Sequence, residues 1–185
     1  MFLFAQLFFI IHLSHSTMAT TYQTQKYELL KTFEDAELRY YPPVMKIQSN
    51  GAFGPLFQYI SGVNESQQKI EMTTPVYQST TDGKPIMEFV LPERFDPQNT
   101  PGASSKNVRV FESKPGYFLA IRFSGYATQN RKEQQAKRLL QLATELQLPM
   151  IGTPLLLVYN SPYRVFNRTN ELLIEIDIQD STLIP

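Results

Sequence analysis

Few side chains in this 185-residue chain have both the type and the spacing that catalysis or metal binding needs. The chain contains no Cys, so it offers neither a thiolate ligand nor a cysteine nucleophile. Its two histidines, His12 and His15, both lie in an apolar N-terminal segment that we expect to stand outside the folded domain. A domain without histidine excludes histidine metal ligation, histidine base catalysis and a Ser-His-Asp triad.

The last apolar run of the chain carries carboxylates that could suggest chemistry. Glu171, Glu175 and Asp177 alternate with the apolar residues Leu172 and Ile174, as in a β-strand with one apolar and one polar face. Such a row could belong to a metal site or to an acid–base pair. An exposed polar strand face explains it with fewer assumptions. We therefore predict no metal ligand and no catalytic residue from these positions.

The overall composition limits the choice of partners. Seventeen basic residues balance seventeen acidic ones, so there is no net field to attract a nucleic acid, and we expect no nucleic-acid partner. Hydrophobic residues make up 42% of the chain, enough to bury a single core in a chain of this length. We expect one domain, acting as a monomer.

The N-terminal residues 1–19 allow two interpretations. The apolar run from Phe2 to Leu13 is too short to span a bilayer but suits the core of a signal peptide. No Lys or Arg precedes it, and Met18 could be the true start, which would make the preceding residues an upstream mis-start. The first case predicts an exported protein and the second a cytoplasmic one. In both cases the folded domain comprises residues 20–185, with no transmembrane span.

Two segments have helical periodicity. In GPLFQYISG, apolar residues fall at the spacing of one helical face over 54–61, with Pro55 in the first turn and Gly62 after the end. The second helix is predicted over 130–147. Asn130 and Glu133 there resemble a capping box, and Pro149 stops the helix. The residues of its predicted buried face are Ala136, Leu139, Leu140, Ala143 and Leu146.

The remaining apolar runs alternate as strands do. In one of them, KIEMTTPVYQ, Pro75 removes a ladder donor, which confines it to a sheet edge, a bulge or a strand start. The element order β-α-β-β occurs twice, which predicts an α+β domain of two antiparallel units that curl against one another, with one helix on each. The predicted strands are 26–31, 36–41, 44–48, 70–78, 86–91, 108–112, 117–123, 154–159 and 172–178.

Several motifs together resemble the SOUL family of haem-binding proteins. They are KYELLKTFEDAELRYYPP, YISGVN, KIEMTTPV, FVLPERF, FSGYA and YNSPYRVFNRTNE, in this order, and the likeness runs from about Tyr27 to Ile178. The resemblance implies a duplicated β-α-β-β fold that forms a distorted antiparallel β-barrel with two principal helices. It also implies non-covalent binding of haem or another porphyrin in a shallow apolar groove. The same fold occurs in effector-binding domains of bacterial transcription regulators.

The first helix and the strand after it would supply the apolar wall of that groove. Phe53, Leu56, Phe57 and Ile60, with Met72, could form an adaptable surface for a flat macrocycle. The alternative is that the same stripe only packs the helix on its sheet. Other family members carry basic side chains on this helix, whereas here Gln58 stands where such a charge is expected.

Basic side chains appear instead in the last loop. Arg164 and Arg168 lie where the family often has a basic loop, although Thr169 replaces its second consecutive arginine. An ordinary solvated loop is the alternative. Because no histidine is available, Tyr or Met would have to ligate the iron, or the iron would be left to solvent. A reversible carrier or buffer is therefore favoured over a redox-active haem protein.

Two other functional classes remain open. Relatives of this fold can hydrolyse strained small molecules with a Glu and an aromatic pocket, a role that Glu88 or Glu171 with Tyr40 or Tyr159 could take. A strongly raised pKa on such a Glu would favour this hypothesis. A protein-interaction module would instead show an exposed apolar patch away from the groove. We expect a binding protein rather than an enzyme.

Overall fold

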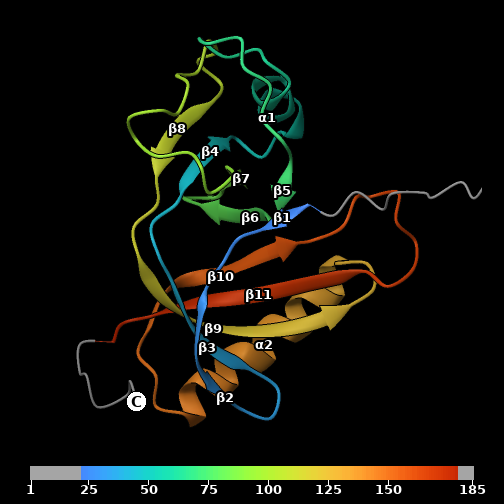
Figure 1. The fold of residues 1–185 in the computed structure, drawn as a ribbon. Helices are drawn as coiled ribbons and strands as arrows, with labels where there is room; N and C mark the ends of the chain where they lie inside the picture. The colour runs from blue at the N-terminus through green and yellow to red at the C-terminus, as the bar shows by residue number, and fades with distance from the viewer. Residues whose placement is uncertain (1–21, 179–185) are drawn as a thin grey trace, which may run out of the picture.

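The computed structural model describes residues 22–178, which form an α+β domain with two helices and eleven strands (Figure 1). The two alternatives for residues 1–19 therefore lie outside the described residues. Across residues 22–178, no helix combines the length and apolarity needed to cross a bilayer. The element types agree with the sequence, and most bounds differ from the predicted ones by one to four residues.

Nine antiparallel strands form one sheet in the order β2-β3-β9-β11-β10-β6-β7-β4-β8. Two short strands, β1 (Gln23–Thr24) and β5 (Thr73–Thr74), pair in parallel beside it. The bounds in the main sheet are β2 Glu28–Thr32, β3 Glu37–Tyr41, β4 Met45–Ser49, β6 Val76–Thr81, β7 Lys84–Val90, β8 Arg109–Glu112, β9 Gly116–Ser124, β10 Met150–Val158 and β11 Thr169–Ile176.

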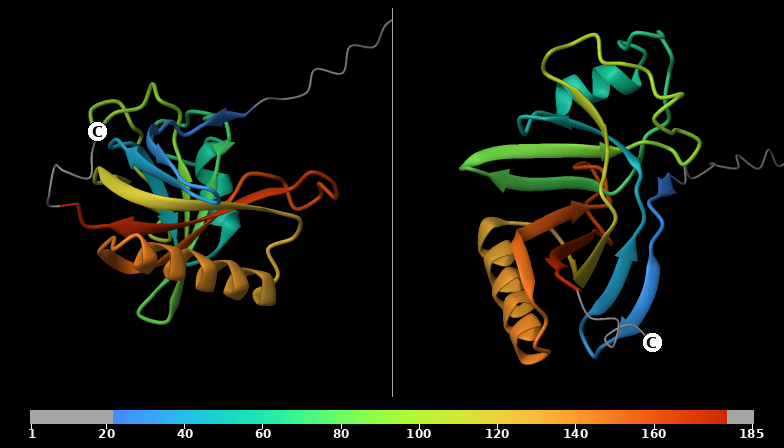
Figure 2. Two further views of the ribbon diagram at one scale, coloured as in Figure 1. Left: turned by 90° about the horizontal axis from the view of Figure 1, so that it is seen from below. Right: turned by 90° about the vertical axis from the view of Figure 1, so that its left-hand side faces the viewer.

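The strand order has a two-fold pattern. On one side of the central β6–β10 pair the order is β6-β7-β4, and on the other it is β10-β11-β9. Helix α1 (Phe53–Ile60) follows β4, and helix α2 (Gln129–Glu145) follows β9, so each half contains the order β-α-β-β. α1 packs against β4 and β7, and α2 packs against β9, β10 and β11, so each helix covers its own half of the curled sheet (Figure 2).

The distorted barrel implied by the family resemblance is not confirmed, because the sheet does not close. Among the described residues, the edge strands β2 and β8 each pair with one neighbour only, β3 and β4 respectively. Both edges are short, with five and four residues. Short edge strands are one of the ways in which open sheets limit unpaired backbone.

The core has one apolar cluster under each helix. Leu139 and Ala143 of α2 are fully buried against β9 and β11, with Ala136, Leu140 and Leu146 partly buried around them, as the sequence predicts. Leu56, Tyr59 and Ile60 of α1 pack against β4, β7 and the loop that follows β7. A third cluster, rich in tyrosine, lies where the two halves meet.

The start of α2 differs from the predicted capping box. The N-cap residue is Thr128, whose hydroxyl oxygen accepts a hydrogen bond from the backbone N–H of Arg131 at 3.4 Å. The Glu133 carboxylate accepts a hydrogen bond from the Gln129 side chain instead, at 2.6 Å. The helix therefore begins two residues earlier than a cap at Asn130 would allow, and a threonine serves the capping function equally well.

The segment KIEMTTPV is two strands rather than one. β5 ends at Thr74, the Thr74–Pro75 peptide bond is cis, and β6 begins at Val76. β6 lies inside the sheet between β10 and β7, so Pro75 occupies a strand start and not an edge. Because proline has no N–H to donate, the position just before a central strand accommodates it without loss of a ladder bond.

Candidate functional site

The apolar stripe of α1 divides into a buried and an exposed part. Leu56 and Ile60 are buried in the core and offer no surface to a ligand. Phe53 and Phe57 are 47% and 51% exposed. Their rings stack with centroids 5.7 Å apart and planes 19° from parallel, and Phe53 also contacts the buried Phe89 at 5.1 Å. The helix thus presents a flat aromatic surface to solvent.

The geometry of a short helix explains this division. Residues four positions apart lie on one face, so Phe53 and Phe57 share one edge of the stripe while Leu56 and Ile60 share its centre. With eight residues, α1 can bury only the centre against the sheet. Met72, which precedes β5, is partly buried against the same cluster as Leu56 and Ile60.

Arg168 stabilises the loop between β10 and β11. It is buried, and its Nη1 donates hydrogen bonds to the carbonyl oxygens of Ser161 and Arg164, each at 2.8 Å. Its guanidinium also lies 4.6 Å from the ring centre of Tyr126. Among the described residues its Nε is a buried donor without a partner. These contacts commit most of the Arg168 side chain to its own loop.

Arg164 is exposed on the same loop, and its Nε donates to the carbonyl oxygen of Phe166 at 3.1 Å. None of the contacts described for Arg164 or Arg168 involves α1. Figure 1 shows α1 on the β4 and β7 half of the molecule, whereas this loop projects from the β10 and β11 half. The structure therefore does not gather the predicted apolar and basic residues into one groove.

The loop also carries an apolar surface of its own. Tyr163 is 91% exposed, Phe166 is 81% exposed, and Val165 between them is exposed as well. These residues were not among the predicted site residues. The sequence does contain a signal for this exposed surface. Apolar residues surround Arg164 in a segment that starts with Ser-Pro and in which no strand or helix was expected.

A buried ionic network occupies the face of the sheet that the helices do not cover. Glu171 of β11 is fully buried and accepts hydrogen bonds from Nη1 and Nη2 of Arg39 at 2.8 and 3.0 Å. It also accepts bonds from Nε and Nη2 of Arg122 at 3.0 and 2.9 Å, and from the Tyr159 hydroxyl at 2.7 Å. The prediction that Glu171 belongs to an exposed strand face is wrong, because β11 lies between β9 and β10 and its residues from Asn170 to Ile174 are all buried.

The network keeps Glu171 ionised. Burial by itself would raise the pKa of Glu171, but the hydrogen bonds and charge of Arg39, with bonds from Tyr159 and Arg122, outweigh burial and hold the pKa below its ordinary value. Burial and the adjacent Glu171 carboxylate raise the pKa of Tyr159 well above its ordinary value. The lowered pKa of Glu171 is the opposite of the raised carboxyl pKa that the hydrolase hypothesis requires.

The other residues of the hydrolase hypothesis are not arranged as an acid–base pair. Glu88 accepts hydrogen bonds from Lys46 at 3.1 Å and Gln48 at 2.8 Å. Tyr40 packs against Tyr117 with ring centres 5.2 Å apart. Only Glu171 and Tyr159 come together, and the five hydrogen bonds to Glu171 occupy the lone pairs that a general base would use.

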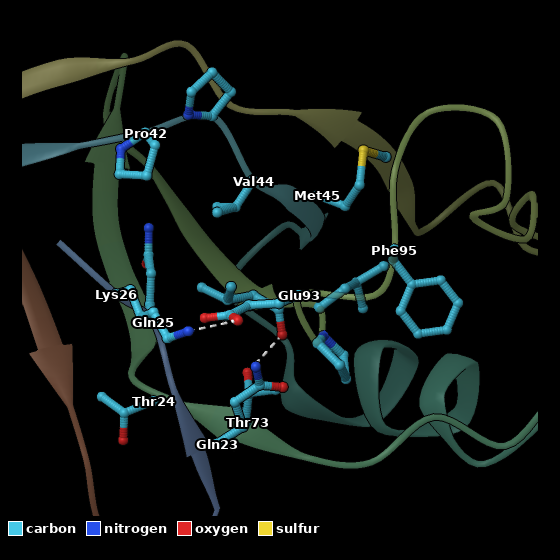
Figure 3. Close-up of a pocket in the computed structure, with 14 residues that line it drawn as sticks. Gln23, Thr24, Gln25, Lys26, Pro42, Val44, Met45, Thr73, Glu93 and Phe95 are labelled. Carbon is cyan, nitrogen blue, oxygen red and sulfur yellow. Dashed lines mark hydrogen bonds and ion pairs between the residues drawn. The ribbon is translucent and has the colours of Figure 1, made fainter.

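A mainly apolar hollow of about 290 Å³ lies beside β1 (Figure 3). Val44, Met45 and Phe95 line its apolar part. At its rim the side chains of Lys26 and Glu93 point toward one another and form an exposed ion pair at 2.9 Å. Its volume is at the lower end of the range of small-ligand sites, so it suits a molecule smaller than a porphyrin.

The chain belongs to the SOUL heme-binding protein family, whose model matches residues 22–175. Membership supports binding of haem or another tetrapyrrole in general terms. No curated protein sequence matches the chain.

Solved structures with the same fold are distant in sequence. The C-terminal domain of EcmrR has 10% identity and a TM-score of 0.56, covering 77% of this chain and 96% of its own. EcmrR in an EcmrR–DNA complex has 11% identity and a TM-score of 0.55, covering 76% of this chain and 56% of its own. A hydrolase from Listeria innocua has 9% identity and a TM-score of 0.54, covering 77% and 91%. These likenesses concern the fold alone.

Proposed function

We propose that this protein binds haem or a related tetrapyrrole reversibly, as a carrier or buffer, on the aromatic surface of α1. The observation that supports this most is the stacked, half-exposed pair Phe53 and Phe57 in a chain of the haem-binding SOUL family. A rigid apolar surface of this kind complements a flat macrocycle by stacking and area burial. Leu56, Ile60 and Met72 would anchor the helix that carries the pair.

Apolar contact dominates the expected affinity. A haem has about 43 non-hydrogen atoms, so at roughly 0.3 kcal/mol per atom contact could supply up to about 13 kcal/mol. An exposed arginine such as Arg164 would add about 0.2–1 kcal/mol through a carboxylate of the macrocycle. Arg168 is committed to its loop and contributes through the position of that loop. The ring surface is therefore the decisive element of the proposed site.

Iron coordination by this chain is a minor part of the proposal. Residues 20–185 contain no histidine and no cysteine, so the usual strong iron ligands are missing from the domain. Haem would bring its own redox chemistry, and the residues of α1 would bind the ring. Reversible binding without a strong ligand suits a carrier or buffer.

Phe57→Asp tests the proposal. A carboxylate in place of the exposed ring would put a charge against the macrocycle, so we expect the Kd for ferric haem to rise more than tenfold. Arg164→Ala should raise it by less than about fivefold. The Soret band measures both, with Thr81→Asp, an exposed change on β6, as the control for added charge. Equal affinity of wild type and Phe57→Asp would refute binding at α1.

A protein-interaction module is the second candidate, because the β10–β11 loop shows the expected exposed apolar patch away from α1. Tyr163, Val165 and Phe166 form this patch. If the patch serves a protein partner, the double change Tyr163→Ser and Phe166→Ser should leave the haem Kd within about threefold of wild type. A larger loss would assign these residues to the tetrapyrrole site.

A further inference from the structure

A second concave site lies on the other half of the molecule, between β9, α2 and the turn before β3. The hollow has a volume of about 370 Å³ and is lined mainly by polar atoms. Arg122 and Ser124 come from β9, Arg131 and Arg138 from α2, and Asp35 from the turn. Glu171, on the sheet face away from α2, compensates the charge of Arg122, so Arg131, Arg138 and Asp35 leave the hollow a formal charge of +1 (2 − 1). Neither proposed function uses this hollow.

Each of the three guanidinium groups is held in place by a contact within the protein. Nη1 of Arg131 donates to the carbonyl oxygen of Ser124 at 2.7 Å, and Arg138 forms an ion pair with Asp35. Arg122 is bound to Glu171 through Nε and Nη2 on the sheet face away from α2, so its guanidinium does not converge with those of Arg131 and Arg138. A guanidinium has five N–H donors, so Arg131 and Arg138 each keep donors beyond those that position them.

The backbone of β9 adds donors to the same place. Pairing of β9 with β3 ends at Ala120, so the strand continues from Arg122 to Ser124 with that edge uncovered by β3. The Ser124 carbonyl faces Arg131 across this edge. Because the N–H and C=O of alternate residues point to the same edge, the N–H groups of Arg122 and Ser124 also face it. A sheet edge with such N–H groups can bind an anion.

We propose that this hollow binds the phosphate group of a small phosphomonoester. Arginine forks match the tetrahedral oxygens of phosphate, and a positively charged lining attracts the anion. The hollow exceeds the volume of a phosphate group, which leaves room for an organic part. The site is independent of the aromatic surface of α1, which lies on the other half of the sheet (Figure 1).

Inorganic phosphate is the probe, titrated by calorimetry into the full chain. Arg131→Gln and Arg138→Gln should each raise the Kd for phosphate about tenfold or more, because each removes a charge-assisted donor. Asp35→Asn should lower the Kd about threefold or more, because it removes a carboxylate from the lining. Lys137→Gln, an exposed change on α2 outside the lining, is the matched control and should leave the Kd unchanged.

Three results would overturn the proposal. The first is no measurable binding of phosphate at about 10 mM. The second is an equal loss of affinity in Lys137→Gln and Arg138→Gln, which would indicate a diffuse charge effect. The third is weaker binding in Asp35→Asn. Phe57→Asp should keep the phosphate affinity of wild type, which separates this site from the proposed tetrapyrrole surface. A phosphomonoester ligand predicts that phenyl phosphate binds at least as tightly as inorganic phosphate, because the hollow has room for its ring.

Discussion

Glu171 is held by more hydrogen bonds than any other carboxylate described in residues 22–178. It takes two bonds from Arg39, two from Arg122 and one from Tyr159, all on a side chain without solvent contact. Arg39 is equally buried and also bonds the Glu37 carboxylate and the Tyr41 hydroxyl. The pair joins β3 to β11, although β9 lies between them.

Glu171→Gln should lower the free energy of unfolding by about 3–5 kcal/mol, since it leaves the buried Arg39 charge without its main partner. Urea denaturation at neutral pH measures this. Glu175→Gln, on the same strand but only partly buried, should change stability by less than about 0.5 kcal/mol. A loss below 1 kcal/mol for Glu171→Gln would mean that Arg39 finds other partners.

The pH dependence of stability follows from the same carboxylate. Its pKa is lower in the folded chain than in the unfolded one, so its contribution is complete above the unfolded value of about 4.5. That contribution disappears as the pH falls through the folded pKa. Wild type should therefore lose more stability than Glu171→Gln between neutral pH and about pH 3, by urea denaturation at each pH. Parallel losses in the two proteins would contradict this.

The β10–β11 loop depends on one arginine. Arg168 binds backbone carbonyls on the far side of the loop and packs on Tyr126, so it acts as an internal brace. The sequence suggested that Arg164 and Arg168 have similar roles, but one is exposed and the other buried. The loop conformation determines which of the two arginines is buried, and a single sequence does not reveal that conformation.

Arg168→Ala should destabilise the protein by about 1–3 kcal/mol and speed hydrogen exchange of the backbone amides in residues 160–168, because the carbonyls of Ser161 and Arg164 lose their donor. Arg164→Ala is the matched control and should stay within about 0.5 kcal/mol of wild type. Mass spectrometry of exchanged peptides measures the loop, and denaturation measures the whole domain. Equal exchange rates in the two variants would show that Arg168 does not brace the loop.

Local sequence patterns predicted most elements well. The periodicities of α1, α2 and the central strands correspond to buried residues such as Leu56, Leu139 and Ile174. Side-chain environment across strands was harder to predict. Glu171 looked exposed because β11 alternates, yet a strand between two others in a covered sheet buries both faces. Arg39 in ELRYY gave a hint, as a charge inside an apolar strand often has a buried partner.

Prediction of the site was also limited, because the site depends on how elements distant in sequence pack together. The α1 stripe was correctly placed on one helix, but its division into buried Leu56 and Ile60 and exposed Phe53 and Phe57 depends on how α1 sits on the sheet. The separation of Arg164 from α1 depends on the arrangement of the two halves. The arginine-lined hollow joins β9, α2 and the turn at Asp35, and no motif connects these segments in the sequence.

The two halves of the domain share an architecture but present different surfaces. The α1 half offers stacked aromatic rings, and the α2 half offers Arg131 and Arg138 beside a sheet edge. Between them the sheet is filled by the Glu171 network and by tyrosines such as Tyr41 and Tyr77, so the inner face is packed with side chains. A tetrapyrrole would therefore bind on the outside of the fold, at α1.

Parallel titration with ferric haem and a metal-free porphyrin tests this account of the function. A variant with His12→Ala and His15→Ala, titrated beside wild type, removes every histidine from the chain. Because the proposed site binds the ring and not the iron, we expect both compounds to bind at micromolar concentrations with affinities within about tenfold, or ~1.4 kcal/mol. A preference of about a hundredfold or more for ferric haem in the variant would show that Tyr or Met ligates the iron. Failure of both compounds to bind would contradict the proposed function itself.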